Sequence, residues 1–567
     1  MPFRSIRREL KHIFAHRRSF EIEPDEIFLD SSNLPEFDEH QFEGRIEKPV
    51  SRTALIVLGI FFLLIGCVGA WKAWDLQIAE GNQYAQLSSD NRLRHSVIFP
   101  KRGVIYDRSG VELAWNDQSP GDPFPSRRYA EIDGVSHVVG FVNYPKKDTS
   151  GVYFQDTFIG KDGVEKELDA IVGGTNGLKI IETNATGEVQ SESVVESPID
   201  GKEITLSLDA AVSEALYKRI AASSATYGFR GGAGVIIDVE NGEVLALAST
   251  PEYSSEALAE GKDAELIARY VADSRTPFLN RVVSGLYAPG SIVKPFVAAG
   301  ALDQGVIDPS AIIVSTGSIK VPNPYVPGAF SVFKDWKALG PVDMRKALAY
   351  SSDVYFYEVG GGFERQRGLG IINLAKYFDL FGLGKISGIN LPAEAGGTIP
   401  TPDWKAATFP NDPTWRIGDT YNTAIGQYGV QVTPLSMARG IAAIANGGML
   451  PMPTVLLGAT TSVTTVPVSD EYLKIVREGM RMGVEEGTVT ALAVPGLRVA
   501  GKTGTAEIGT LKQYVNSWVI GFFPYEKPRY AFAVVMERGP VSNLVGAAAV
   551  MGQFLNWLVV NKPEYIQ

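Results

Sequence analysis

The sequence predicts an α+β protein: one antiparallel sheet covered by helices, joined through a strand-rich segment to a single N-terminal transmembrane helix. Strand patterns lie on both sides of a helix-rich middle, at 233–248 and at 497–536. Strands that flank a helical insertion favour one sheet with helices packed against it. Residues 54–71 form an uncharged apolar run, close to the ~20 residues that a bilayer-spanning helix needs.

The charges beside this run predict its orientation. Arg45, Lys48 and Arg52 precede it, and further basic residues lie towards the N-terminus. Positive charge is enriched on the cytoplasmic side of a membrane. We therefore expect a single-pass protein of the cell (inner) membrane, with a cytoplasmic and mostly disordered tail at 1–52. A transmembrane helix follows at 53–75, and the remainder lies outside, in the periplasm.

Three other interpretations of the apolar run are weaker. A cleaved signal peptide would begin with an unusually long polar leader. Residues 64–67, which end at Cys67, resemble a lipoprotein cleavage site, and the same long leader argues against it. A buried helix of a soluble domain is disfavoured because the run is long and carries no charge.

Histidine and cysteine are too scarce for several kinds of catalytic site. The 567 residues contain one cysteine and five histidines, and every histidine precedes residue 138. No intrachain disulfide can form, and the larger part of the chain has no residues for a Ser-His-Asp triad, a Cys-His dyad or a histidine-rich zinc site. The net charge of −11 argues against nucleic acid as a main partner.

Residues 76–203, which we call the pedestal, alternate short apolar runs with turns. Such runs predict short strands and hairpins. The pedestal shows no catalytic pattern, and we interpret its two histidines, His95 and His137, as structural. The predicted strands lie at 103–110, 136–142 and 177–184.

Residues 204–567 predict the helix-covered sheet. A hairpin turns at Asn241-Gly242, a pair that favours tight turns between strands. A helix-rich stretch then occupies roughly 260–450 before strand patterns return. The other predicted elements are a helix at 210–224, strands at 497–499, 517–523 and 530–536, and a C-terminal helix at 547–560.

Ser291 and Lys294 lie one helical turn apart, after a Pro-Gly turn. This spacing places both side chains on one face of a helix that begins at the serine. A serine hydroxyl needs a base to attack a carbonyl, and a lysine can serve when burial or a neighbouring cation lowers its pKa. Taken alone, the pair is more often a helix cap than a catalytic site.

Two further triplets follow in the same domain. Ser351 and Asp353 precede an aromatic helix pattern, where a lone Ser-Ser-Asp would usually cap the helix. Lys502, Thr503, Gly504 and Thr505 lie in a strand pattern, where an edge lysine is usually solvated. Glycine leaves room for a ligand backbone to approach the strand. Together, in this order, the three triplets match the motif set of penicillin-binding proteins and class A β-lactamases.

The segment from about residue 98 to the C-terminus resembles the class B penicillin-binding proteins, the monofunctional D,D-transpeptidases of peptidoglycan synthesis. Within that family, Asp353 and residues 333–336 are similar to the elongation-type branch, penicillin-binding protein 2. Division-type members usually have Asn in place of Asp353 and remain the alternative. Further matches lie at 100–108, 160–165, 279–281 and 426–434.

The resemblance implies acyl transfer through a seryl ester. Ser291 would be the nucleophile and Lys294 its base, with Ser351 relaying a proton and Asp353 orienting the lysine. Lys502, Thr503 and Thr505 would hold the terminal carboxylate of a peptidoglycan stem peptide, beside Gly504. The backbone N–H groups of Ser291 and Thr505 would form the oxyanion hole. No cofactor is implied, and β-lactams would acylate Ser291.

The sequence departs from the family in two places. Some elongation-type relatives carry a zinc site between the first two motifs, but this interval has aspartates and neither His nor Cys, so we predict no zinc. The head of the pedestal is expected to be deleted or reduced, because 113–116 leads almost directly to 127–129. Binding of the elongation scaffold protein is therefore in doubt. The aspartates are Asp303, Asp308, Asp335 and Asp343.

The resemblance also implies a partner, and it leaves several alternative functions open. Too few residues separate the membrane helix from the transpeptidase for a glycosyltransferase domain, so a membrane-embedded polymerase of the SEDS family would supply glycan strands. A β-lactamase, a D,D-carboxypeptidase and a β-lactam sensor use the same acyl-serine chemistry. The three intact motifs argue against a purely structural scaffold.

Overall fold

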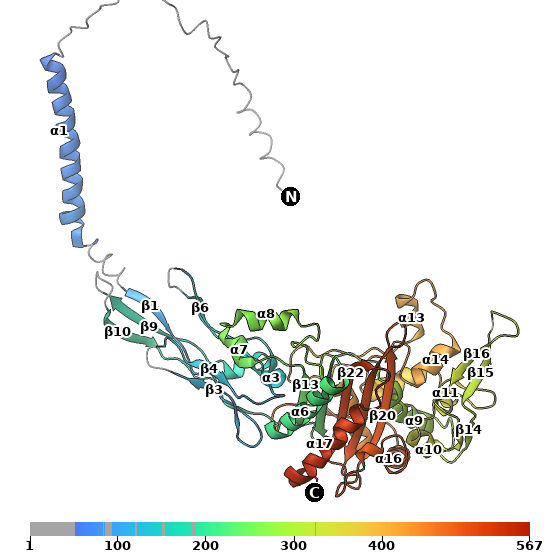
Figure 1. Ribbon diagram of the computed structural model, residues 1–567. Helices are drawn as coiled ribbons and strands as arrows, with labels where there is room; N and C mark the ends of the chain where they lie inside the picture. The colour runs from blue at the N-terminus through green and yellow to red at the C-terminus, as the bar shows by residue number, and fades with distance from the viewer. Residues whose placement is uncertain are drawn as a thin grey trace, which may run out of the picture. The chain divides into compact units, whose positions relative to one another are not determined.

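A computed structural model describes residues 51–82, 84, 93–118, 122–149, 153–183, 189–323 and 325–566. The tail expected at 1–52 lies outside the described residues except for its last two positions. The chain forms two compact units, Met1–Arg92 and Leu93–Gln567. Figure 1 follows them from blue at the N-terminus to red at the C-terminus.

The described part of the first unit is dominated by one long apolar helix. α1 (Arg52–Trp74) continues into a π-helical turn, η4 (Asp75–Ala79), and together they give 28 helical residues. The hydroxyl of Ser51 caps the start by accepting a hydrogen bond from the N–H of Ala54. None of the most apolar stretch is buried in the protein, and its length suits a bilayer.

The pedestal contains two main sheets. One has the order β1-β9-β10 and is antiparallel, and the other has the order β11-β2-β3-β4, with β11 parallel to β2. Short strand pairs β5–β8 and β6–β7 complete it. The strands are β1 (Leu93–Ile98), β2 (Ile105–Tyr106), β3 (Glu112–Asp117), β4 (Ser126–Tyr129), β5 (Val142–Asn143), β6 (Lys146–Lys147), β7 (Tyr153–Gln155), β8 (Ile159–Gly160), β9 (Gly177–Thr183), β10 (Val189–Glu196) and β11 (Ile204–Thr205).

The strand predicted at 136–142 is wrong for most of its length. Ser136–Val139 forms a short helix, α3, and only Val142–Asn143 pairs as β5. The N–H groups of Val138 and Val139 both donate to the carbonyl of Val135, which closes a helical turn. A short apolar run cannot by itself distinguish a strand from a buried helical turn. The strand predicted at 177–184 is present as β9, whereas that at 103–110 shrinks to β2.

A buried ion cluster ties the pedestal together. Glu165, at the end of the resembling segment 160–165, pairs with Arg102 at 2.5 Å and with Arg127 at 2.7 Å. All three side chains are almost fully buried. Although burial opposes ionisation, the two guanidinium groups hold the pKa of Glu165 below its usual value. The cluster lies beside α4 (Gly163–Glu167) and α5 (Asp169–Val172).

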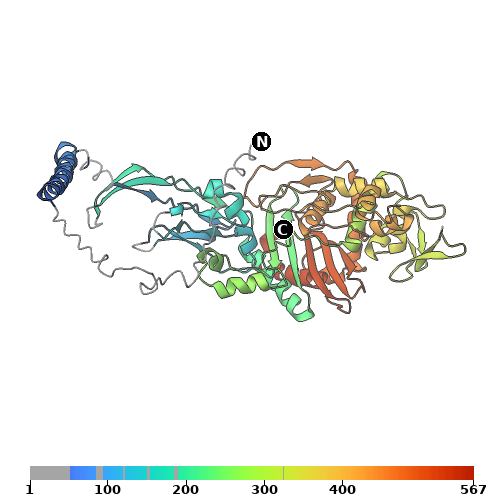
Figure 2. The same cartoon turned by 90° about the horizontal axis from the view of Figure 1, so that it is seen from above.

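The third of the chain's larger sheets has five strands in the order β13-β12-β22-β21-β20, all antiparallel. Figures 1 and 2 show its green and red strands side by side. The predicted hairpin turns at Gly242, whose φ of +76° suits glycine. The strands are β12 (Gly231–Asp238), β13 (Val244–Thr250), β20 (Ala500–Ile508), β21 (Tyr514–Phe523) and β22 (Tyr530–Pro540).

Helices cover this sheet, as predicted, and they lie on both of its faces. α6 (Ala210–Tyr227) and α17 (Ala547–Asn561) pack on one face with Ile236, Val519 and Val534. The opposite face carries the larger core of the helix-rich middle. The strand predicted at 497–499 is displaced, because β20 begins at Ala500. Buried Leu497 and Val499 belong to the core around α17 instead of a strand ladder.

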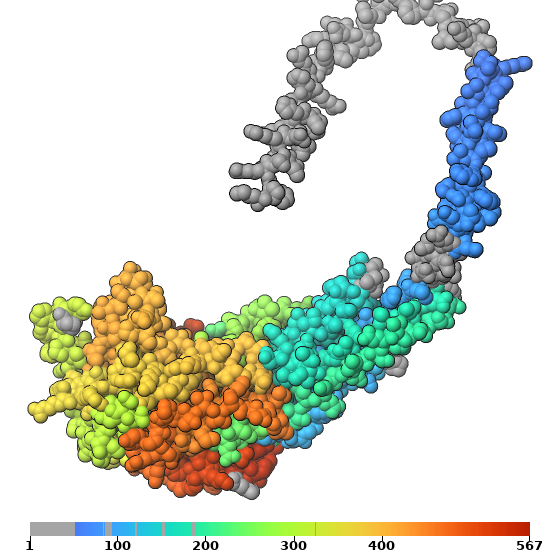
Figure 3. All heavy atoms as spheres, turned by 180° about the vertical axis from the view of Figure 1, so that it is seen from behind, coloured from blue at the N-terminus to red at the C-terminus, as the bar shows by residue number. Residues whose placement is uncertain are grey.

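The helix-rich middle, yellow-green to orange in Figure 3, carries the first two sequence motifs. Small hairpins interrupt it, with β14 paired to β17, β15 to β16 and β18 to β19. Its helices are α7 (Ser255–Glu260), α8 (Ala264–Ala272), α9 (Lys294–Asp303), α10 (Met344–Ala349), α11 (Asp353–Gly361), α12 (Ile371–Leu380), α13 (Pro402–Thr408), α14 (Ile417–Ala424), α15 (Pro434–Ala445) and α16 (Asp470–Glu485). Its strands are β14 (Ile313–Ser315), β15 (Ser318–Pro322), β16 (Phe330–Lys334), β17 (Gly340–Val342), β18 (Met449–Pro451) and β19 (Val463–Thr465).

Candidate active site

Ser291 lies in a tight turn between strand β20 and the loop at Gly426. The turn is a 3-10 helix, Gly290–Val293, that leads directly into α9. Gly290 has a φ of +59°, and its N–H donates to the carbonyl of Gly426 at 2.9 Å. A Cβ at Gly290 would lie 2.7 Å from the carbonyl oxygen of Thr505. Close backbone contacts therefore hold Ser291 beside the third motif.

Lys294 begins α9 and is fully buried. Its Nζ donates to the carbonyl of Ser351 at 2.8 Å and to Oγ of Ser351 at 3.2 Å. It also forms a 2.7 Å ion pair with Oδ1 of Asp353. The face of the Phe356 ring lies 5.5 Å from the same nitrogen. The first and second predicted motifs thus meet at one buried amine.

The second motif caps α11, although not with the serine that faces Lys294. Ser352 is the N-cap, because its Oγ accepts from the N–H of Tyr355 at 3.2 Å. Ser351 precedes it with a φ of +59°, a left-handed conformation that is uncommon for serine. This backbone turn leaves the Ser351 carbonyl and hydroxyl free to accept from Lys294.

Asp335 holds this cap in place, a role that sequence reasoning missed. Its carboxylate accepts from Oγ of Ser352 at 2.7 Å and from the N–H groups of Asp353 and Val354 at 3.1 Å each. A fourth bond, at 2.9 Å, comes from Oγ of Ser315. A carboxylate at a helix N-terminus satisfies free N–H groups and complements the helix dipole. The resemblance at 333–336 was the only sequence signal for it.

The third motif lies on β20, the edge strand of the five-stranded sheet. Thr503 and Thr505 face the cleft from alternate positions, and Oγ1 of Thr503 is 2.9 Å from Oγ1 of Thr488. Lys502 is fully buried, and its Nζ donates to the carbonyl of Thr503 at 2.9 Å. Burial and the nearby Lys294 hold the pKa of Lys502 well below its usual value. The expectation that a lysine on an edge strand is solvated therefore does not hold for Lys502.

The reason inferred for Gly504 needs correction. A Cβ there would lie 2.6 Å from the carbonyl oxygen of Pro289 and 2.8 Å from Cγ2 of Ile292. The close approach at this position is therefore made by the protein's own turn that carries Ser291. Any larger residue at 504 would push Ser291 away from β20.

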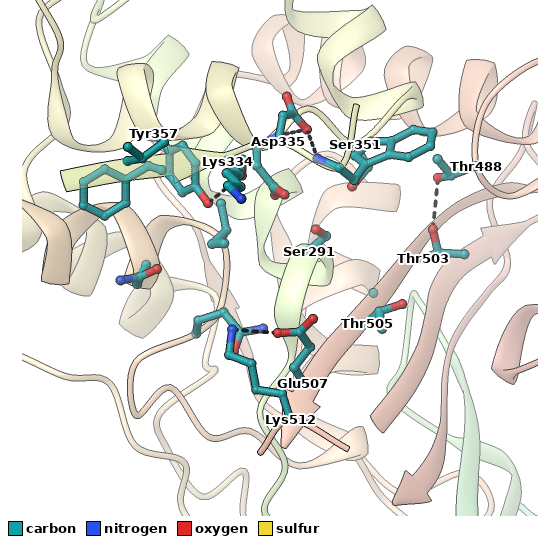
Figure 4. A pocket seen from close by; sticks show the side chains of 18 residues that line it. Ser291, Lys334, Asp335, Ser351, Tyr357, Thr488, Thr503, Thr505, Glu507 and Lys512 are labelled. Carbon is teal, nitrogen blue, oxygen red and sulfur yellow. Dashed lines mark hydrogen bonds and ion pairs between the residues drawn. The ribbon is translucent and has the colours of Figure 1, made fainter. Parts of the chain in front are cut away.

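These residues meet at a cleft of about 920 Å³. Figure 4 shows Ser291 at its centre, between Ser351 on one side and the strand carrying Thr503 and Thr505 on the other. Lys294 and Lys502 are buried beneath the lining. Sequence reasoning gave no role to several other lining residues, which come from distant segments: Val332, Phe333, Lys334, Trp336, Tyr357, Asn422, Ile425, Gln427, Thr488, Glu507 and Lys512.

The aspartates between the first two motifs are engaged elsewhere. Asp335 caps α11 and Asp343 caps α10, while Asp308 accepts from Ser310 and Asp303 from Tyr377. Within the described ranges, no group of three His, Cys, Asp or Glu side chains could hold a metal ion. The absence of zinc stays a prediction that metal analysis of the purified protein would test.

Comparison with known proteins decides the family. The model of the penicillin-binding protein transpeptidase domain matches residues 232–556, and that of the penicillin-binding protein dimerisation domain matches 122–206. The chain belongs to the penicillin-binding protein transpeptidase family. Among its relatives, peptidoglycan D,D-transpeptidase MrdA of Haemophilus influenzae is 30% identical over 91% of this chain and 93% of the relative. MrdA of Acinetobacter baumannii is 28% identical, over 92% and 90%.

Solved structures place this penicillin-binding protein in the elongation-type branch, penicillin-binding protein 2. The Pseudomonas aeruginosa penicillin-binding protein 2, in complex with WCK 5153, has a TM-score of 0.69 at 29% identity, covering 84% of this chain and all of that one. The Helicobacter pylori protein, in complex with MreC, has a TM-score of 0.69 at 25% identity, covering 83% and 99%. The resemblance drawn from the motifs is confirmed.

Proposed function

We propose that this penicillin-binding protein is the peptidoglycan D,D-transpeptidase of cell-wall elongation and that β-lactams inhibit it by acylating Ser291. The observation that carries the assignment is the meeting of three motifs at one cleft around the buried Lys294 amine. The related proteins named peptidoglycan D,D-transpeptidase cover nearly the whole chain, which supports the same activity here.

In the first step, Oγ of Ser291 attacks the carbonyl carbon between the two D-alanines of a stem peptide. The C–N bond breaks, an ester forms on Ser291, and D-alanine leaves with a proton. Lys294 accepts the serine proton, and Ser351, 3.2 Å from its Nζ, passes a proton to the leaving nitrogen. An amine of a second stem peptide then takes the acyl group, and the proton it loses restores the Ser291 hydroxyl.

The remaining motif residues stabilise charge. The backbone N–H groups of Ser291 and Thr505 would bind the developing oxyanion. Thr503 and Thr505 face the cleft and would hold the terminal carboxylate of the substrate. Lys502, buried under Thr503, would contribute through its electrostatic effect on this carboxylate and on Lys294.

The membrane arrangement and partners extend this proposal. α1 anchors the enzyme, with the N-terminus in the cytoplasm and the pedestal (76–203) and transpeptidase domain (204–567) in the periplasm. β3 and β4 pair directly, with Asp117 opposite Ser126, and the short connection between them in the sequence, 118–125, supports a reduced pedestal head. A SEDS-family polymerase would supply glycan strands. One related structure is described as a peptidoglycan synthase complex that coordinates polymerization and crosslinking, and the complex of another with MreC makes a scaffold partner worth testing.

A product assay tests the reaction. Purified full-length protein in detergent is mixed with its polymerase partner and lipid-linked substrate, and the products are digested and separated. Cross-linked dimers support transpeptidation. Free D-alanine without dimers would instead favour a D,D-carboxypeptidase, and rapid hydrolysis of nitrocefin would favour a β-lactamase.

A further inference from the structure

A second pocket, of about 610 Å³, lies between the pedestal and the transpeptidase domain. The pedestal contributes β3, β4 and the loop 130–136 to its wall, and the transpeptidase domain contributes α6, α7, α8 and the turn before α7. α7 packs against β4 and β5 (Figure 1). Among the described residues, this pocket and the catalytic cleft have no lining residue in common, and the mechanism proposed above gives the pocket no role.

Acidic side chains dominate the charged groups that line this interdomain pocket. Within the described ranges, the acidic residues are Glu131, Asp133, Glu252, Glu256, Glu260 and Asp263, and the basic one is Lys262. Glu256 and Glu260 also pair with Arg128, and Asp263 caps α8. The side chain of Lys262 is 80% exposed. The excess of carboxylates therefore favours a cationic occupant.

Two buried oxygens at this pocket make no hydrogen bond within the described part of the chain. Oε1 of Glu252 accepts from the N–H of Gly134 at 2.6 Å, whereas Oε2 has no partner. Oγ of Ser255 has none either, and Ser255 is only 6% exposed. Burial raises the pKa of the Glu252 carboxyl to about 8. Because unpaired buried acceptors are uncommon and costly, both oxygens point to a hydrogen-bond donor that the described chain does not supply.

The other lining residues narrow the kind of cation. Tyr217 and Tyr270 line the same pocket and are partly exposed. A guanidinium group stacks on aromatic rings, and its fork of N–H donors matches a carboxylate better than an ammonium does. Within the described residues, no group of three His, Cys, Asp or Glu side chains could hold a metal ion. The volume also exceeds what a guanidinium fills, which leaves room for the peptide chain that carries it.

We propose that the interdomain pocket is a docking site for an arginine side chain of a partner protein. Its guanidinium donates to Oε2 of Glu252 and Oγ of Ser255 and stacks on a tyrosine ring. Because the pocket wall comes from both the pedestal and the transpeptidase domain, the bound segment would hold the two together. The proposal goes beyond the acyl-transfer function and does not depend on it.

Calorimetric titration of the full-length protein in detergent tests the ligand class. N-acetyl-arginine methylamide presents the side chain as a protein does and should bind to wild type. N-acetyl-lysine methylamide should bind about tenfold more weakly, since it lacks the forked donors. Methylguanidinium, which lacks the peptide groups, should also bind more weakly. Equal binding of the lysine derivative, or tighter binding of Mg²⁺, would overturn the guanidinium assignment, and equal binding of methylguanidinium would overturn the protein source.

Substitutions in the pocket test which groups bind the arginine derivative. Glu252→Gln should weaken binding about tenfold and Ser255→Ala about threefold. Oγ of Ser255 has no partner to lose, so Ser255→Ala should unfold at the wild-type temperature, which separates lost affinity from lost folding. Tyr270→Phe should keep the affinity, whereas Tyr270→Leu removes the ring and should lower it about threefold.

Glu358→Gln provides a matched control. Glu358 lies on α11, and burial raises the pKa of its carboxyl to about 7, but it does not line the interdomain pocket. This variant should bind the arginine derivative as wild type does, and a tenfold loss would contradict the location of the site. Failure of wild type to bind the derivative, or wild-type affinity in both Glu252→Gln and Ser255→Ala, would overturn the inference.

Discussion

Nζ of Lys294 lies 2.7 Å from Oδ1 of Asp353, and this ion pair joins the start of α9 to the start of α11. Lys294 is fully buried, whereas the carboxylate is partly open to the cleft. A buried charged group that loses its partner is costly. The pair therefore fixes where the lysine amine lies.

Asp353→Asn and Asp353→Ala should separate orientation from charge. The Asn oxygen can still accept from Lys294, so acylation by a chromogenic β-lactam should slow by no more than about tenfold. The Ala variant leaves the buried amine without its partner and should slow acylation by about a hundredfold or more. Stopped-flow measurement of the acylation rate constant checks both. Equal effects of the two substitutions would contradict an orienting role.

Asp335 acts through the second motif and is a positioning residue. Asp335→Ala removes the acceptor for Ser352 and for two backbone N–H groups of α11. We expect a loss of about 1–2 kcal/mol of stability together with a fall in the acylation rate constant and little change in β-lactam affinity.

Asp263→Ala is the matched control for Asp335. Asp263 caps α8, its Oδ1 accepting from the N–H of Leu266 at 2.8 Å, and it does not line the cleft. This variant should lose stability without slowing acylation. If the Asp335 variant also acylates at the wild-type rate, its hydrogen bonds serve folding alone.

The motif residues and Asp335 show what the sequence could and could not predict. Ser291, Lys294 and Ser351 belong to motifs whose spacing predicts shared chemistry, and the structure brings them together. Asp335 lies in the family match at 333–336, but no local pattern indicates its role, because its partner Ser352 comes close only when the β15–β16 hairpin folds beside α11. Thr488, which contacts Thr503, was missed for the same reason.

The fold was predictable to a similar extent. The long helix α6 appears as expected because buried positions recur along it. The β12–β13 hairpin appears as expected because two fully buried apolar strands meet at the Asn241-Gly242 turn. The short run at 136–142 became α3, since a few buried residues satisfy either period. Gly504 was correctly singled out as a close approach, but the approaching group is Pro289. A sequence shows that space is needed without showing what fills it.

Replacing Lys502 with an apolar residue should raise the stability of the protein and abolish its activity. Its pKa in the folded protein is well below the usual value of 10.5. At pH values between the folded-state pKa and 10.5, the unfolded chain therefore binds a proton that the native protein lacks. Stability from this group therefore rises with pH across that window. Lys502→Met removes the penalty and should stabilise the protein at neutral pH by about 1 kcal/mol or more, while abolishing acylation. Thermal unfolding together with penicillin labelling checks this, and a destabilised variant would contradict it.

His137 should make the folded protein sensitive to acid. Burial lowers its pKa from 6.5 to about 4, even though Nε2 lies 2.9 Å from the carbonyl of Pro277. Between these values the unfolded chain binds a proton that the native protein does not. The contribution of His137 to the free energy of unfolding is therefore fully present above pH 6.5. It is lost as the pH drops towards 4, by about 3 kcal/mol.

Thermal unfolding across this pH range measures the effect. His137→Gln should flatten the profile. His95→Gln, which changes an exposed histidine on β1, should leave it as in wild type. An unchanged slope in the His137 variant would assign the acid sensitivity to other groups.

Covalent labelling by a penicillin identifies the reactive serine. The full-length protein is treated with a fluorescent penicillin, digested, and the modified peptide is sequenced by mass spectrometry, with Ser291→Ala treated in parallel. We expect one adduct, on Ser291, and no labelling of the variant. An adduct on another residue, or labelling that survives in Ser291→Ala, would contradict it.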